Sequence, residues 1–360
     1  MAPRLVIDQR TLRLILLAFL LLAGLTVHRL YFTEPSGPVD ALLLQGETMG
    51  TTWKIRIAGD GLDEDLRERV RIETERRLDD IDRWMSTWNP DSEISRFNTA
   101  PGLEPFPVSF ETAEVVALAL DVGRASGGAF DVTVGPLVAL WGFGSQAREQ
   151  SVPSDAAIEE LRRHVGPQTL DVDRGDPGAG GLLVKREAEV QIDLSGIAKG
   201  YGVDHVVRGL RALGREDFLV EIGGEIRAAG ERPGGGPWRV AIEQPLDHGR
   251  AIQEVIPLSD QAMATSGDYR IFYREKGRRL SHTLDPRTGR PVDDRTASAT
   301  VLAPDCATAD AWATALLVLG PYPGLEMARQ EGLAALLLIR DPAGGLREIR
   351  NELFPESISP

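Results

Sequence analysis

Apolar and polar residues alternate in one early segment of the chain and then change to a helical spacing. Trp53, Ile55 and Ile57 alternate with polar neighbours, and this period of two predicts a half-buried strand. From Leu62 to Met85 the apolar residues recur at helical intervals, which predicts one long amphipathic helix. A polar stretch at residues 86–98 follows and is expected to be a loop.

The later elements are predicted from periodicity and from cap and turn residues. We expect a second helix at residues 111–126, stopped by Gly127 and Gly128, and a third begun by Ser154 and ended by Gly166. The further segments expected to be regular are strands at 190–193, 219–222, 238–242, 298–302 and 334–340, a hairpin at 269–284, and helices from about residue 200, at 307–316 and at 323–331.

The order of these elements defines the expected fold class. Strands come in runs joined by short turns, not in strict alternation with helices. We therefore predict an α+β fold, with a largely antiparallel mixed sheet and packed helices, over residues 42–355.

The N-terminus reads as an export signal. A basic region at residues 1–13 precedes an apolar segment at 14–32, and a short tether rich in Pro and Gly follows at 33–41. The apolar run lies between signal-peptide length and that of a spanning helix. We favour an uncleaved membrane anchor, with a cleaved signal as the alternative. Leu25 stands where a lipoprotein would need its acylated cysteine.

Composition excludes some classes of function. Acidic residues outnumber basic ones 54 to 40, for a net charge of −14, which argues against nucleic acid as a partner. A single cysteine, Cys306, excludes an internal disulfide framework and a cysteine-based zinc site.

The segment ATADAWATAL, residues 307–316, carries Asp310 and Thr314 in an otherwise small and apolar helix. Residues four apart share a helix face, so the carboxylate and hydroxyl converge, with the Ala307 carbonyl beside them if the helix begins irregularly. Hard oxygen ligands of this kind suit Mg²⁺ or Ca²⁺. The alternative is that Asp310 only caps or charges the N-terminus of this same helix and that Thr314 bonds back to a carbonyl.

The segment IDLSGIAKGYGVD, residues 192–204, places Asp193 at the end of an expected strand and Lys199 at the start of a helix. Backbone N–H groups at a helix start, together with a lysine, can form an anion site for a pyrophosphate or dinucleotide. A tight strand-to-helix turn with a surface lysine explains the same pattern equally well.

Two further segments carry candidate chemistry. His282, in SHTLDPRTGRP (281–291), could accept a proton or contact a phosphate, or it could be a structural histidine. In GGAFDVTVGPLVALWGFG (127–144), glycines flank aromatic and aliphatic residues as they would around a flat ring. Alternatively, these glycines could simply belong to loops, and the aromatic and aliphatic residues between them could be part of the hydrophobic core.

Taken in order, these segments resemble the ApbE family of exported flavin transferases. The matching blocks are ETMGTTW (47–53), MSTWNPDSEISRFN (85–98), GGAFDVTVGPLVALWGFG, DLSGIAKGYGVDH (193–205), FLVEIGGEIRAAG (218–230), SHTLDPRTGRPV and ATADAWATALLVLG (307–320). They span nearly the whole chain after the apolar segment.

The resemblance implies an activity and a place in the cell. It implies Mg²⁺-dependent transfer of the FMN moiety of FAD to a Thr or Ser hydroxyl of a target protein, with release of AMP. The implied acceptor is a flavoprotein subunit of a membrane electron-transfer complex. The enzyme would be held in the bacterial inner membrane with its catalytic domain facing the periplasm.

The resemblance also assigns residues to roles. The implied FAD contacts are Met49, Trp88, Ala129, Phe130, Asp131, Asp193, Lys199 and Ser281. The implied metal ligands are Asp310, Thr314 and the carbonyls of Gly196 and Ala307. His282, Lys199 and Asp193 are the candidate catalytic residues, and the general base is left open among His282, Asp131 and Asp193.

Two positions depart from the family pattern: Trp88 stands where relatives often have Tyr, and Gly196 stands where some relatives have Ala. Stacking survives the first change, and a carbonyl ligand survives the second. Two rival functions use the same residues: a Mg²⁺-dependent FAD pyrophosphatase with water as nucleophile, and an exported FAD-binding protein without catalysis.

Overall fold

The computed structural model describes residues 41–145, 152–246, 249, 251–268, 272–275 and 278–358. The expected basic region, membrane anchor and tether (1–13, 14–32 and 33–40) lie outside the described residues, and Ala41 begins the first strand. None of the helices in the described part of the chain is long and apolar enough to cross a membrane.

The centre of the fold is an antiparallel sheet, which confirms the predicted mixed α/β fold with a large antiparallel sheet. In spatial order its strands are β1 (Ala41–Thr48), β2 (Thr51–Ala58), β6 (Phe218–Ile222), β7 (Glu225–Ala229), β10 (Ala262–Gly267), β15 (Thr296–Ala303), β16 (Ala334–Arg340) and β17 (Leu346–Arg350).

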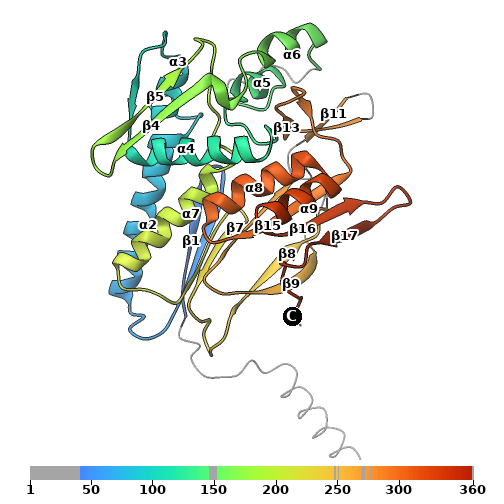
Figure 1. Cartoon of the computed structure of the whole chain (residues 1–360). Helices are drawn as coiled ribbons and strands as arrows, with labels where there is room; N and C mark the ends of the chain where they lie inside the picture. The colour runs from blue at the N-terminus through green and yellow to red at the C-terminus, as the bar shows by residue number, and fades with distance from the viewer. Residues whose placement is uncertain are drawn as a thin grey trace, which may run out of the picture. The chain divides into compact units, whose positions relative to one another are not determined.

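Helices cover one face of this sheet, as Figure 1 shows. They are α2 (Glu64–Met85), α7 (Ala198–Ala212), α8 (Cys306–Leu319) and α9 (Pro321–Gln330). Helix α8 packs against β10, β15 and α7, and it is buried on nearly all sides. A helix surrounded by protein needs apolar residues all round, and this accounts for the alanine-rich composition of α8.

A hairpin of β8 (Trp238–Glu243) and β9 (Ile252–Leu258) packs its apolar side chains against the other face of the sheet. Strands β15 and β16 are therefore buried on both faces and read as continuous apolar runs. Strand β2 is buried mainly on its helix side, which explains why Trp53, Ile55 and Ile57 alternate with exposed residues.

The remaining elements form smaller layers around the helices. They are α3 (Glu93–Thr99), β3 (Phe106–Val108), α4 (Phe110–Ala125), α5 (Gly135–Leu140), α6 (Asp155–Arg162), the 3₁₀ turn η1 (Pro167–Thr169), β4 (Leu170–Asp176), β5 (Gly180–Lys185), β11 (Phe272–Glu275), β12 (Arg278–Ser281), β13 (Leu284–Asp285) and β14 (Arg290–Pro291). The predicted N-cap at Ser154 is confirmed, because its side chain accepts a hydrogen bond from the Ala157 N–H at 3.3 Å.

Two predicted elements are wrong. The polar stretch 86–98 is not all loop, because Ser92 caps α3 by accepting a hydrogen bond from the Ser95 N–H at 3.0 Å. The segment 190–193 is not a strand; it makes only an isolated parallel bridge between Gln191 and Val134. Its apolar residues, Val190 and Ile192, are buried, and the Asn98 side chain, not a neighbouring strand, pairs with the N–H and carbonyl of Ile192.

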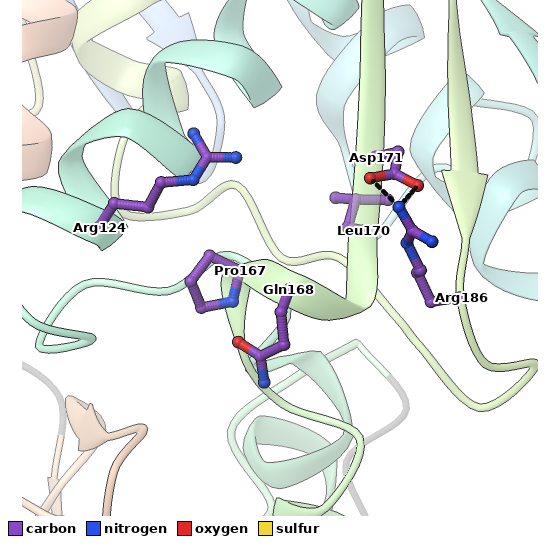
Figure 2. Close-up of a pocket in the computed structure, with 6 residues that line it drawn as sticks. All are labelled: Arg124, Pro167, Gln168, Leu170, Asp171 and Arg186. Carbon is purple, nitrogen blue, oxygen red and sulfur yellow. Dashed lines mark hydrogen bonds and ion pairs between the residues drawn. The ribbon is translucent and has the colours of Figure 1, made fainter.

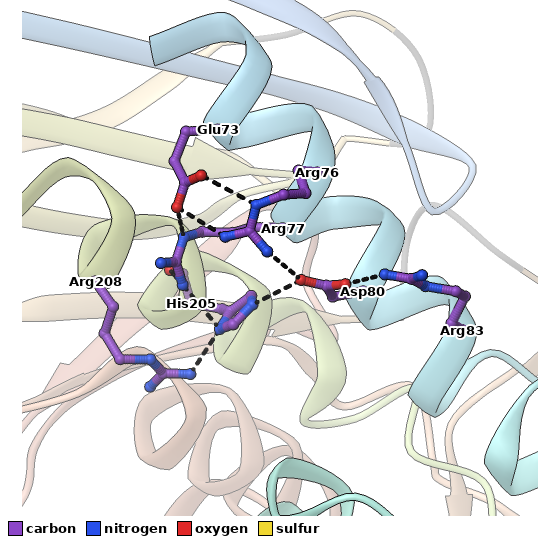
Figure 3. Close-up of polar contacts among 7 residues, drawn as sticks. All are labelled: Glu73, Arg76, Arg77, Asp80, Arg83, His205 and Arg208. Atoms are coloured by element: carbon purple, nitrogen blue, oxygen red, sulfur yellow. Dashed lines mark hydrogen bonds and ion pairs between the residues drawn. The ribbon is translucent and has the colours of Figure 1, made fainter. Parts of the chain in front are cut away.

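Helices α2 and α7 meet through a polar network around the buried His205 (Figure 3). Arg208 and Arg77 lie 3.0 and 3.3 Å from the imidazole Nδ1, while Nε2 lies 3.5 Å from Asp80. Two guanidinium donors on Nδ1 require that nitrogen to be unprotonated. Burial, together with Arg208 and Arg77, lowers the pKa of His205 well below its usual range.

This network predicts a loss of stability in acid. In the native state the pKa of His205 lies below its unfolded value, so below about pH 6.5 the unfolded state takes up a proton that the native state excludes. Between pH 7 and pH 5, the free energy of unfolding of the parent should fall by about 2 kcal/mol more than that of His205→Gln. Urea unfolding at both pH values measures this difference. His164→Gln, at a more exposed histidine, serves as the control, and parallel profiles for the parent and His205→Gln would contradict the prediction.

Candidate active site

Asp310 and Thr314 lie one turn apart on α8, as the sequence predicts. Asp310 is 2% exposed, and its Oδ2 accepts a hydrogen bond from the Gly200 N–H at 3.0 Å. Its other oxygen accepts no hydrogen bond from the described residues. Burial raises the pKa of this carboxyl, and Lys199 and the Gly200 N–H oppose the rise. A buried carboxylate with one uncommitted oxygen is available to a cation.

The hydroxyl of Thr314 has a partner that the sequence did not indicate. Its Oγ1 lies 2.9 Å from the Ser266 Oγ at the end of β10. Thr314 is only partly buried in a helix whose neighbouring residues are buried. The two hydroxyls therefore converge at one place on the helix face that also carries Asp310.

The segment that leads into α7 lies against the same face of α8. A Cβ on Gly196 would lie 3.5 Å from the Thr314 Oγ1 and 3.0 Å from the Phe130 ring. A Cβ on Gly200 would lie only 2.3 Å from the Cys306 carbonyl oxygen. Two glycines thus allow the start of α7 to approach α8 closely, and they bring Gly196 beside Thr314 and Lys199 near Asp310.

Lys199 forms an ion pair with a carboxylate that sequence reasoning missed. Its Nζ lies 2.7 Å from the Oε1 of Glu225, the first residue of β7. Burial opposes the charged ammonium, but Glu225 and Asp310 together raise the pKa of Lys199 above its usual value. Glu225 is 2% exposed, and its own pKa is raised by burial. Lys199 therefore remains a cation beside two acidic groups.

Asp204 is a second residue that the sequence did not single out. Its carboxylate accepts hydrogen bonds from the backbone N–H groups of Cys306, at 2.9 Å, and of Ala307, also at 2.9 Å. Burial raises the pKa of Asp204 to about 6. Asp204 thus ties the first turn of α8 to α7. The helix starts regularly, since the Ala309 N–H donates to the Asp305 carbonyl at 3.2 Å, and the irregular start expected at Ala307 is not found.

The segments around Asp131 and Asp193 run side by side. The Asp193 N–H donates to the Val132 carbonyl at 2.7 Å, next to the bridge between Val134 and Gln191. The Asp131 carboxylate accepts hydrogen bonds from the N–H and hydroxyl of Thr133, at 2.8 and 2.6 Å, and burial raises its pKa. Asp193 accepts hydrogen bonds from the N–H and hydroxyl of Ser195, which shapes the turn before Gly196. Both carboxylates therefore have local structural partners.

The remaining aromatic and apolar candidates differ in exposure. Ala129 and Phe130 are buried at 1% and 4% exposure, and Phe130 contacts the Gly196 position. Met49 occupies the left-handed region, with φ 47°, and its side chain end lies 3.2 Å from a Cβ placed on Gly202 of α7. A non-glycine residue in this region is strained, and strain of this kind gathers at functional sites.

Trp88 is 72% exposed, although its loop is held by several hydrogen bonds. The Ser86 hydroxyl accepts hydrogen bonds from the N–H groups of Trp88 and Asn89, and the Ser86 carbonyl accepts from the hydroxyls of Ser92 and Ser95. An exposed indole on a fixed loop is suited to stack on a planar ligand.

Ser281 and His282 belong to the β11–β12 region. Ser281 is buried, and its hydroxyl accepts a hydrogen bond from the Thr283 N–H at 3.1 Å. The His282 ring lies 6.4 Å from the Phe143 ring, and Phe143 packs on Tyr273. These contacts are made with residues 143, 273 and 283. They do not involve the start of α7 or helix α8, where Gly196, Lys199, Asp310 and Thr314 come together.

The oxygen donors around Asp310 fit a hard divalent cation. They are one carboxylate oxygen without a hydrogen bond among the described residues, the hydroxyls of Thr314 and Ser266, and the adjacent Gly196 backbone. Oxygen donors of this type, with room for water or phosphate, suit Mg²⁺. Lys199 and the positive end of the α7 dipole would favour an anion at the same place.

Two other clusters of polar residues lie elsewhere on the described part of the protein. His164, Glu187 and Glu189 bring possible ligand atoms together, but both glutamates are exposed, and His164 and Glu187 already lie in contact at 2.5 Å. The surface pocket in Figure 2 contains Arg124, Arg186 and Asp171, and the charge of Arg186 is paired by Asp171. Neither place combines buried ligand atoms with a lysine and a helix start.

A lysine, a helix N-terminus and a set of oxygen donors at one place are chemically suited to a phosphate-containing substrate. The family model described as the ApbE family matches residues 49–337. A FAD:protein FMN transferase of Vibrio cholerae is 42% identical over 323 residues, which cover 89% of this chain and 94% of that protein.

Solved structures agree with this match. The flavin transferase ApbE from Vibrio cholerae superposes with a TM-score of 0.78 at 41% identity, over 88% of this chain and 98% of that one. The apo form of the Pseudomonas stutzeri flavinyl transferase ApbE gives a TM-score of 0.77 at 38% identity, over 87% and 95% of the two chains. The chain belongs to the ApbE family, and it is a transferase.

Proposed function

We propose that the protein transfers the FMN moiety of FAD to a Thr or Ser hydroxyl of another protein, with Mg²⁺ as cofactor and AMP as the released product. The observation that carries this proposal is the group formed by Asp310, Thr314, Gly196 and Lys199 where α7 meets α8. Relatives at 42% and 43% identity carry the name FAD:protein FMN transferase, which supports the transfer of FMN from FAD to a protein.

The proposed reaction exchanges one phosphorus–oxygen bond for another. The acceptor hydroxyl oxygen bonds to the phosphorus on the FMN side of the FAD pyrophosphate. The bond from that phosphorus to the bridging oxygen breaks, and AMP leaves with that oxygen. The hydroxyl proton passes to a base, for which His282, Asp131 and Asp193 remain the candidates. A phosphodiester then joins FMN to the acceptor.

The residues of the chain have distinct tasks in this scheme. Asp310, Thr314 and the backbone carbonyl of Gly196 would hold Mg²⁺, which when bound would supply positive charge against the pyrophosphate oxygens. Ala307 lies in the regular first turn of α8, so the irregular start that would have offered its carbonyl is absent. Lys199 places a fixed positive charge next to the same group, and Glu225 holds its ammonium in place. The buried Phe130 and the exposed Trp88 would both contact the flavin.

The partner and the location are further parts of the proposal. An acceptor flavoprotein subunit of a membrane electron-transfer complex fits an enzyme that transfers a flavin to a protein hydroxyl. A periplasm-facing enzyme held by residues 14–32 fits the basic and then apolar order of the N-terminus. Fractionation of cells expressing the full chain tests the location.

The central test is mass spectrometry of a candidate acceptor that is co-expressed with the protein. Covalent addition of one FMN, and its dependence on Mg²⁺ with purified components, is the expected result. Free FMN with an unlabelled acceptor would indicate a pyrophosphatase instead. Tight FAD binding with no AMP released would indicate a binding protein without catalysis.

Trp88 provides a test of the flavin contact. We expect Trp88→Ala to weaken FAD binding about tenfold, because stacking on the indole is lost, whereas Trp88→Tyr should stay within about twofold. The side chain is 72% exposed, so neither change should alter the melting temperature. Flavin fluorescence titration measures the affinity, and equal affinity of the alanine variant and the parent would contradict the contact.

A further inference from the structure

Lys199 lies under the influence of two buried carboxylates but pairs with only one of them. Its Nζ is 2.7 Å from the Glu225 Oε1, and among the described residues it forms no ion pair with Asp310. Asp310 nevertheless acts on the lysine electrostatically, because the carboxylate is buried close to the partly exposed Lys199 side chain. Two carboxylates therefore compete for the Lys199 ammonium, and in this structure it pairs with Glu225.

The backbone places Glu225 at this point by a tight turn. Gly223 and Gly224 connect β6 to β7 with φ values of 63° and 111°, a conformation that glycine adopts readily. Glu225 follows as the first residue of β7, opposite Ile222 in the sheet register. Its side chain enters the protein and is 2% exposed.

Glu225 is held there at a cost. Its Oε2 is buried and accepts no hydrogen bond from the described residues, while Oε1 faces Lys199. A buried polar atom without a partner is destabilising, because it loses its hydrogen bonds to water and gains none in return. Retention of such a group indicates a role other than stability, and its one strong contact is with the lysine of the site.

We propose that Glu225 is a positioning residue that holds the Lys199 ammonium away from Asp310 and thereby keeps the Asp310 carboxylate available to a divalent cation. This inference rests on the proposed function, in which Asp310 binds Mg²⁺. An ammonium in hydrogen-bond contact with Asp310 would have to be displaced before a cation could bind, and in a poorly solvated site that displacement is costly.

The test is a double-mutant cycle on cation binding to the full-length protein. Glu225→Gln keeps the shape of the side chain but removes its charge, and Lys199→Met removes the competing ammonium. Titration of the FAD-loaded protein with MgCl₂, followed by calorimetry and by the rise in melting temperature, gives the Mg²⁺ affinity without a transfer assay.

We expect Glu225→Gln to weaken Mg²⁺ binding about tenfold in the parent and to have less than about a twofold effect when Lys199 is already Met. Glu221→Gln, on the neighbouring strand β6, is the matched control, because its carboxylate is partly exposed and pairs with Lys54 at 3.9 Å. This control should leave the Mg²⁺ affinity unchanged.

Two outcomes would overturn this inference and leave the proposed function intact. Equal losses of Mg²⁺ affinity in both lysine backgrounds would mean that Glu225 acts directly on the cation. Unchanged affinity in Glu225→Gln, with a lowered melting temperature, would mean that Glu225 only supports the fold. Failure of the parent to bind Mg²⁺ at all would overturn this inference together with the metal part of the proposed function.

Discussion

Replacing Asp310 by alanine should reduce the rate of FMN transfer on the order of 10³-fold. The side chain is 2% exposed, and one of its carboxylate oxygens accepts no hydrogen bond from the described residues. Its removal takes away the only formal charge among the proposed cation ligands. Flavinylation of an acceptor protein, measured by in-gel flavin fluorescence at saturating FAD and MgCl₂, gives the rate.

Two further variants separate chemistry from folding. Asp310→Asn keeps an oxygen that can accept the hydrogen bond from the Gly200 N–H but lacks the charge, so it should lose activity and keep a melting temperature close to that of the parent. Thr308→Ala changes a partly buried hydroxyl on the same helix and should remain active. Substantial transfer by the asparagine variant would show that the charge is not needed, and the proposed cation site would then be wrong.

The sequence predicts the helices better than it predicts the strands. Helices α2, α4 and α8 have continuous apolar faces and clear ends, so periodicity and caps locate each of them. Strands β1, β7 and β10 were not predicted, because each is short or is defined mainly by its pairing with distant partners. Residue identity carries little information about such pairings.

The same limit applies to the site. Asp310, Thr314 and Lys199 can be singled out because they stand as polar residues in small or apolar surroundings with informative spacing. Ser266 lies 48 residues before its partner Thr314, on a strand that the sequence did not indicate. Glu225 lies within the block FLVEIGGEIRAAG, where an acid beside two glycines reads as a turn; only the packing of β7 against α7 brings it to Lys199.

Helix α8 carries the candidate cation ligands and also makes the contacts that fix its position against α7. One oxygen of Asp310 accepts a hydrogen bond at the start of α7, whereas the N-terminus of its own helix is capped by Asp305. The other oxygen accepts no hydrogen bond from the described residues, so one carboxylate can join the two helices and still bind a ligand. Asp204 provides the reciprocal contact from α7 to the start of α8. The geometry of the site therefore depends on how closely the two helices approach.

Gly200→Ala should be among the most damaging substitutions in the chain, with an expected loss of about 3 kcal/mol in the free energy of unfolding. The added Cβ would lie 2.3 Å from the Cys306 carbonyl oxygen and 2.8 Å from the Asp310 Cβ, both within the rigid first turns of α8. The helices must separate to admit it, which moves Asp310 away from Lys199. Urea unfolding and the transfer rate should both decline.

Gly202→Ala is the matched control, one half-turn further along α7. Its Cβ would meet the mobile end of Met49 at 3.2 Å and otherwise only side-chain atoms at 3.6 Å or more. A small shift of Met49 accommodates the methyl group, and alanine favours the helix by about 1 kcal/mol over glycine. We therefore expect this variant to be as stable as the parent or more so. Equal stability of the two alanine variants would contradict the close approach of α7 to α8, and with it the arrangement of Asp310, Gly196 and Lys199 on which the proposed chemistry depends.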